Sequence, residues 1–161
     1  MSNETLGEIA HRLHAARGIE AQLGALAALA WRKSPEVRVR AHALTDHGID
    51  RQDKIRLIID DLHRRFFYAP DPVKESIHWP SSDGACNGVD VDDACLVVAA
   101  FAMSVGIPCR IVGARYGRQR WTCFVAYEDE EGRWCGVDPL RQKTTRPIEE
   151  LMFSGMGPSC P

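Results

Sequence analysis

The chain has 161 residues, of which 45% are hydrophobic and 26% are charged, and its formal net charge is −2. These values are typical of one globular domain with its own core, and they do not favour nucleic acid or an anionic membrane surface as a partner. No apolar run reaches the roughly 18 residues of a transmembrane helix, and the polar start MSNETLGEIAHRLH lacks the apolar centre of a signal peptide. We therefore expect a cytoplasmic protein without a membrane partner.

Helical spacing of apolar residues dominates the first part of the chain. Residues 3–32 carry it, and Gly18 is expected to break or bend this segment. Ser34 as an N-cap and Pro35 in the first turn predict the start of a new helix, which ends near Gly48.

A further helix, a long loop and a buried helix are predicted next. Asp50 is expected to cap the first of these, with Asp53 as the partner of a weak capping box. Residues 68–89 are rich in Pro, Ser and Gly and predict an ordered loop, which at this length is usually functional. Residues 91–105 are apolar in every direction, which is typical of a helix at the centre of a fold, and Gly106 is its expected stop.

The pattern then changes to the two-residue period of strands. Strands are predicted over Cys109–Ala114, Trp121–Tyr127 and Arg133–Val137. The acidic turn at 128–131 is expected to be a solvated hairpin tip, and Pro147 to start a last helix over Ile148–Phe153. This order predicts an α+β domain, with a helical extension at 1–48 and the α+β domain at 49–161 in one compact unit.

The cysteines do not form a recognisable metal or disulfide pattern. None belongs to a CxxC pair, and no group of Cys and His has the spacing of a zinc site. In a reducing cytoplasm they are best interpreted as thiols, and most as small core residues. We expect no metal and no cofactor. The six are Cys86, Cys95, Cys109, Cys123, Cys135 and Cys160.

Four segments together resemble the transglutaminase-like superfamily, in the papain-like cysteine enzyme class. DVDDA resembles the opening of the family's central helix, VGIPCRIVG its helix-to-strand turn, and WTCFVAYEDEEGRWCGVDP its histidine-bearing strand and hairpin. FFYAPDPVKESIHWP is similar to the approach segment of the subset encoded in tailed-phage and prophage genomes. The resemblance covers roughly residues 50–140. It implies N-terminal helices and a buried central helix packed on a small antiparallel sheet.

The resemblance implies the chemistry of that family, which is acyl transfer by a cysteine, a histidine and an aspartate. The aspartate position matches Asp138, but the cysteine position holds Val91 and the histidine position holds Trp121. Neither side chain can act as a nucleophile or a base. Asp138 is then a vestigial orienter or an ordinary strand-end cap. Asp90 as N-cap, with Asp93 at the third position of the helix, satisfies the helix start without a thiol.

These residues leave several functions open. The first is a non-catalytic structural or protein-binding component, with phage structural proteins as partners in tailed-phage virion assembly (head, neck or tail), located in the host cytoplasm or the virion. The alternative is a cysteine hydrolase or amidase with a displaced nucleophile at Cys86 and His78 as its base. A third hypothesis is a peptide or small-ligand binder that retains the old cleft.

Overall fold

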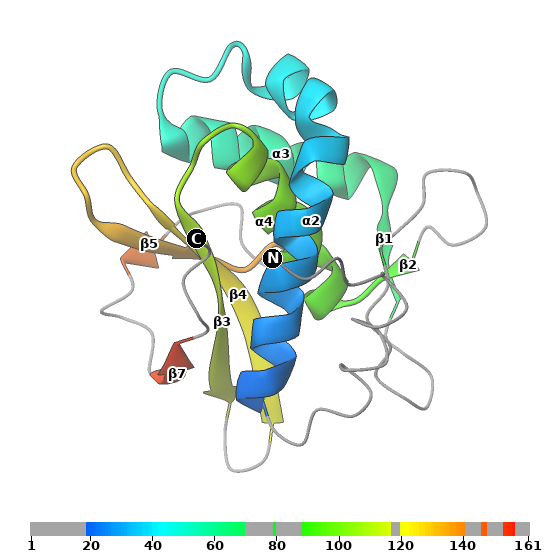
Figure 1. The fold of residues 1–161 in the computed structure, drawn as a ribbon, viewed down its shortest axis with the longest axis vertical. Helices are drawn as coiled ribbons and strands as arrows, with labels where there is room; N and C mark the ends of the chain where they lie inside the picture. Colours follow the sequence, from blue (N-terminus) through cyan, green and yellow to red (C-terminus); the bar gives the residue numbers. More distant parts are fainter. Residues whose placement is uncertain are drawn as a thin grey trace.

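The structure, a computed structural model, describes residues 19–69, 79, 88–116, 120–140, 146–147 and 153–156. In these parts of the chain it is an α+β fold of three helices and a small antiparallel sheet, with one further pair of short parallel strands (Figure 1). The elements are α2 (Ile19–Thr45), α3 (Arg51–Arg65), β1 (Phe67–Tyr68), β2 (Gly88–Val89), α4 (Val91–Ser104), β3 (Cys109–Tyr116), β4 (Arg120–Glu128), β5 (Trp134–Val137), β6 (Arg146–Pro147) and β7 (Phe153–Met156).

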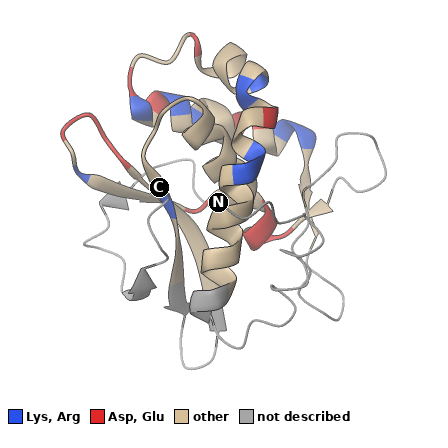
Figure 2. Cartoon of the chain, in the orientation of Figure 1, with Lys and Arg blue, Asp and Glu red and all other residues tan. Residues whose placement is uncertain are grey.

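Helix α4 lies at the centre of the molecule, between the other two helices and the sheet (Figure 1). Every residue from Asp93 to Ala102 is buried, which confirms the prediction from its apolar sequence. Figure 2 shows charge gathered on α2, α3 and the hairpin, whereas α4 is charged only in its first turn.

The end of α4 is set by Gly106, as predicted. This glycine has a φ of +77°, a conformation that costs little only without a Cβ. Its N–H donates to the carbonyl of Met103 at 3.1 Å, and the N–H of Ile107 donates to the carbonyl of Ala102 at 2.9 Å. The two bonds form a Schellman motif, which turns the chain toward β3.

The five-stranded sheet has the order β6-β5-β4-β3-β7, with every pair antiparallel. Its central meander of β3, β4 and β5 is the one predicted. Alternation along the strands turns Ile111, Val125 and Val137 toward the helices, where they join the main core. Val112 and Phe124 belong to a smaller cluster on the opposite face.

Helix α2 runs without interruption through Pro35, so the predicted helix start at Ser34 was wrong. Proline has no N–H to donate to the carbonyl of Trp31, four residues earlier. The Ser34 hydroxyl donates to that same carbonyl instead, at 2.9 Å, and so replaces the missing hydrogen bond. Packing reinforces this, because buried residues before and after the proline, including Leu26 and Ala41, belong to the main core.

Helix α3 begins as predicted, because the Asp50 side chain accepts the N–H of Asp53 at 2.7 Å. Its buried face, Ile55, Ile58, Ile59 and Leu62, joins the core that α2 and α4 share. Among the described residues, no helix is long and apolar enough to cross a membrane.

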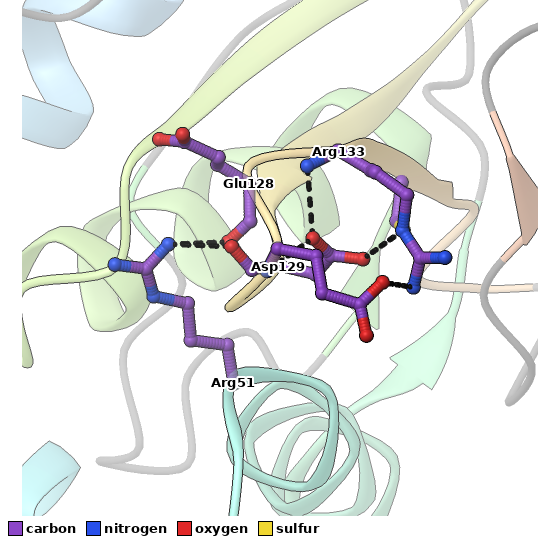
Figure 3. Close-up of polar contacts among 6 residues, drawn as sticks. Arg51, Glu128, Asp129 and Arg133 are labelled. Atoms are coloured by element: carbon purple, nitrogen blue, oxygen red, sulfur yellow. Dashed lines mark hydrogen bonds and ion pairs between the residues drawn. The ribbon is translucent and has the colours of Figure 1, made fainter.

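The tip of the acidic hairpin between β4 and β5 is exposed at Glu130 and Glu131, as predicted, but Asp129 at the start of the turn is buried and the turn contacts α3 (Figure 3). The guanidinium of Arg51 donates to the carbonyls of Glu128 and Asp129, at 3.0 and 2.9 Å. Asp129 is buried and accepts N–H groups of Glu131 and Arg133. Burial opposes the charge of Asp129, but these hydrogen bonds outweigh it and hold the pKa of Asp129 below its usual value. The hairpin is therefore anchored to the start of α3.

The chain after β5 differs from the prediction where the structure describes it. Pro147 lies in β6 and Phe153 begins β7, so neither belongs to a helix at the predicted ends. Residues 148–152, the rest of that predicted helix, lie outside the described residues. Of the predicted loop, the ends are described: Phe67 pairs with Gly88 and Tyr68 with Val89, in parallel.

Candidate functional site

The candidate site is the start of α4, where β2, α4 and β4 meet. Strand β2 leads directly into Asp90, whose extended backbone (φ −92°, ψ −170°) is that of an N-cap. Its Oδ1 accepts the N–H groups of Asp92 and Asp93, at 2.9 and 3.0 Å. The capping role predicted for Asp90 is thus present, and the side chain of Asp93 is buried in the same turn.

Val91 is the first residue of the helix, at the position that the resemblance assigns to the nucleophile. Its half-buried side chain packs against the main core. A thiol at such a helix end would be favoured as thiolate by the helix dipole, but valine has no group to ionise.

Two thiols lie immediately behind this position. The Sγ of Cys123 is 2.9 Å from Oδ1 of Asp92 and 3.7 Å from the carbonyl oxygen of Val91. Cys95 lies one helical turn after Val91 and is close enough to Cys123 for the two thiols to influence each other. Both cysteines are buried.

The surroundings of these thiols keep them protonated. Burial raises the pKa of Cys95, and the negative charges of Asp92, Asp138 and Asp90 raise it further. The neighbouring thiol of Cys95, followed by burial, raises the pKa of Cys123 well above its usual value. Both side chains are therefore neutral near pH 7, the form of cysteine that does not attack a carbonyl.

Asp138 lies close enough to act electrostatically on Cys95. Its Oδ1 accepts the N–H of Leu140 at 2.9 Å, which is the strand-end role left open by the sequence. The ring of His63, at the end of α3, contacts the carbonyl oxygen of Pro139 through Nε2 and holds the same turn. No sequence signal pointed to His63, since it lies 76 residues from Pro139.

Of the three other residues predicted for the site, the structure describes the backbone of one. Trp121 is in β4, where its backbone pairs with Arg115, but its side chain is outside the described part. Cys86 and His78 also lie outside the described residues. Cys95 was missed as a site residue, although its spacing of four from Val91 puts both on one helical face.

No group of three or more His, Cys, Asp or Glu side chains within the described ranges is arranged to hold a metal ion. The chemistry visible at the start of α4 is a set of carboxylates and protonated thiols around an apolar first residue.

Comparisons with known proteins yield a likeness of fold. No family model matches the chain, and no curated protein matches it. A solved structure from Parabacteroides distasonis, described as a "putative protease", is similar with a TM-score of 0.55 and 15% sequence identity. The match covers 80% of this chain and 27% of that chain. The likeness is thus to the fold of about a quarter of a larger protein.

Proposed function

We propose that this chain is a non-catalytic protein of the transglutaminase-like, papain-like group, and that it acts by binding other proteins. Four sequence segments in the family's order support the assignment, as does the packing of a buried central helix on an antiparallel sheet. The fold shared with part of a protein described as a protease agrees with it.

The observation that carries the proposal is the start of α4. Val91 stands where a nucleophile would benefit most from the helix dipole. The nearest described thiols, Cys95 and Cys123, are buried and have raised pKa values. The apolar residue at the nucleophile position and the protonated thiols behind it both favour a packed structural element over a catalytic site.

Exposed aromatic residues support a role in protein contacts. Phe67 and Tyr68 of β1 are each 62% exposed, although they are large and apolar. Side chains of this kind on a surface are enriched at sites of protein association.

The finer part of the proposal is a structural role in tailed-phage virion assembly, at the head, neck or tail. It rests on the resemblance of FFYAPDPVKESIHWP to the phage-encoded subset alone. If it is right, purified virions contain this chain at a fixed copy number, measured by quantitative mass spectrometry. Virions from which the chain is absent would contradict it.

The test of the non-catalytic assignment is the alkylation rate of each cysteine on the folded protein, resolved by peptide mass spectrometry between about pH 5 and 9. We expect every thiol to react no faster than an ordinary one, and Cys95 and Cys123 to react more slowly. The same protein unfolded in urea gives the reference rate for each peptide.

The alternative, a hydrolase that uses Cys86, has one observation in its favour. Strand β2 begins at Gly88 and leads straight to the cap of α4, so Cys86 is tethered close in sequence to the candidate site. Rapid alkylation of Cys86 with a pKa below about 8.5, together with amide or ester hydrolysis that Cys86→Ala abolishes, would replace our proposal with this one.

A further inference from the structure

The two neighbouring thiols behind the helix start, Cys95 and Cys123, make no contact that protein binding would require, so their pairing calls for its own explanation. Cys95 belongs to α4 and Cys123 to β4, two elements that pack face to face. Cys123 is also within 3.7 Å of the carbonyl oxygen of Val91, which shows how closely this part of β4 approaches the helix. The two thiols therefore lie at the contact between α4 and β4, which are separated in the chain by β3.

We propose that Cys95 and Cys123 are the reduced form of a disulfide, which forms when the protein meets a two-electron thiol oxidant and ties α4 to β4. The other two described cysteines are engaged elsewhere. The thiol of Cys109 lies 3.6 Å from the carbonyl oxygen of Ala99, and that of Cys135 lies 3.9 Å from Oδ2 of Asp129. Among the described cysteines the geometry thus points to a single pairing.

The chemistry of the step balances with an oxidant such as a peroxide or a diazene. Two S–H bonds break and one S–S bond forms, while two electrons and two protons pass to the oxidant. With the diazene diamide, the N=N bond takes them up and becomes a hydrazine. Asp92 accepts a hydrogen bond from Cys123 and is placed to receive its proton as the sulfur reacts.

The surroundings also set the rate. The carboxylates of Asp90, Asp92 and Asp138 face the pair and disfavour a thiolate, as does burial. Since the thiolate is the attacking form, oxidation at neutral pH is slow and accelerates as the pH rises. The bond is thus suited to sustained oxidation and not to a rapid signal.

The experiment treats the folded full-length chain with diamide at pH 7 and pH 9, blocks the remaining thiols, digests the protein and maps linked peptides by mass spectrometry. We expect a peptide that joins Cys95 to Cys123, formed faster at pH 9 and lost after reduction with dithiothreitol. Cys135→Ala should retain this link and Cys123→Ala should lose it.

A second readout is the thermal midpoint, Tm. The oxidised wild type should unfold at a higher Tm than the reduced form, because the link restricts the unfolded chain. Oxidised Cys123→Ala should show no such rise.

Three results would overturn the inference. These are a Cys95–Cys123 pair that stays reduced while other thiols are oxidised, a link that forms only in urea, or a link that joins two chains. The peptide map of the wild type decides between them even where a variant fails to fold. None of these results bears on the alkylation of Cys86, so this inference and the proposed function fail independently.

Discussion

The thiol of Cys123 lies 2.9 Å from the carboxylate of Asp92, across the boundary between β4 and the first turn of α4. The neighbouring thiol of Cys95 and burial, followed by this contact, raise the pKa of Cys123 well above its usual value. The packing of the candidate site therefore depends on thiols that keep their protons.

The stability of the fold should fall at alkaline pH for this reason. The folded pKa values of Cys95 and Cys123 are raised, so the folded state binds these protons more tightly than the unfolded state. Their contribution is fully present below the unfolded pKa of about 8.5 and is lost as the pH rises through the folded values. Urea unfolding between about pH 7.5 and 10.5 measures the decline. The double variant Cys95→Ala, Cys123→Ala should show a shallower decline, and an equal slope would refute the explanation.

Loss of the cap at Asp90 should weaken α4. Asp90→Ala removes the acceptor for the N–H groups of Asp92 and Asp93, and should lower the free energy of unfolding by about 1 kcal/mol. Asp90→Ser retains an acceptor and should lose much less. Chemical denaturation of the two variants side by side checks the order, and equal losses would show that Asp90 acts through its charge and not as a hydrogen-bond acceptor.

Removal of the Arg51 side chain should loosen the β4–β5 hairpin from α3, although the backbone N–H of Arg51 still donates to Glu130. Arg51→Ala deletes the donors to the carbonyls of Glu128 and Asp129 and should cost about 1–2 kcal/mol of stability. Hydrogen exchange should increase at the hairpin amides of the variant. Arg56→Ala is the matched control, because Arg56 is exposed and pairs with Asp53 within its own helix. Equal effects of the two substitutions would show that the hairpin does not depend on Arg51.

The buried carboxylate of Asp61 should matter more than either arginine that it contacts. It lies 2.8 Å from Arg40 and 2.7 Å from Arg65, whose guanidinium stacks over Phe66 and Phe101. Burial lowers the pKa of Arg65, which shows that its charge is already disfavoured. Asp61→Ala leaves that charge without its partner and should cost about 2–4 kcal/mol.

The control for Asp61 is Arg40→Ala. The side chain of Arg40 is half-exposed, so this substitution should cost less than about 1 kcal/mol. Thermal unfolding of both variants gives the comparison, and a larger loss for Arg40→Ala would contradict the assignment.

The sequence allowed α4, its cap at Asp90 and its stop at Gly106 to be predicted, because each depends on neighbours within a few residues. The same local logic failed at Ser34. A serine before a proline is a good helix start, but here its hydroxyl satisfies the carbonyl that the proline leaves open. Only the packing of both halves of α2 on the core decides between these outcomes.

The contacts that complete the candidate site are non-local, so periodicity could not reveal them. Helical spacing puts Cys95 on the face of Val91, and strand alternation puts Cys123 on the face of Val125, but neither pattern says that the two faces meet. Arg51 and Asp129 are 78 residues apart, so no local pattern could indicate their contact. Strands as short as β6 carry too few residues to show a period.

The order of the sheet also bears on how the protein is made. Strands β6 and β7 occupy its two outer edges, and both follow residue 145 in the chain. Until the ribosome has released them, β5 and β3 present unpaired N–H and C=O groups, and such edges readily pair with other chains. A chain in which β6 and β7 have not yet joined the sheet therefore exposes two edges that can pair with another copy.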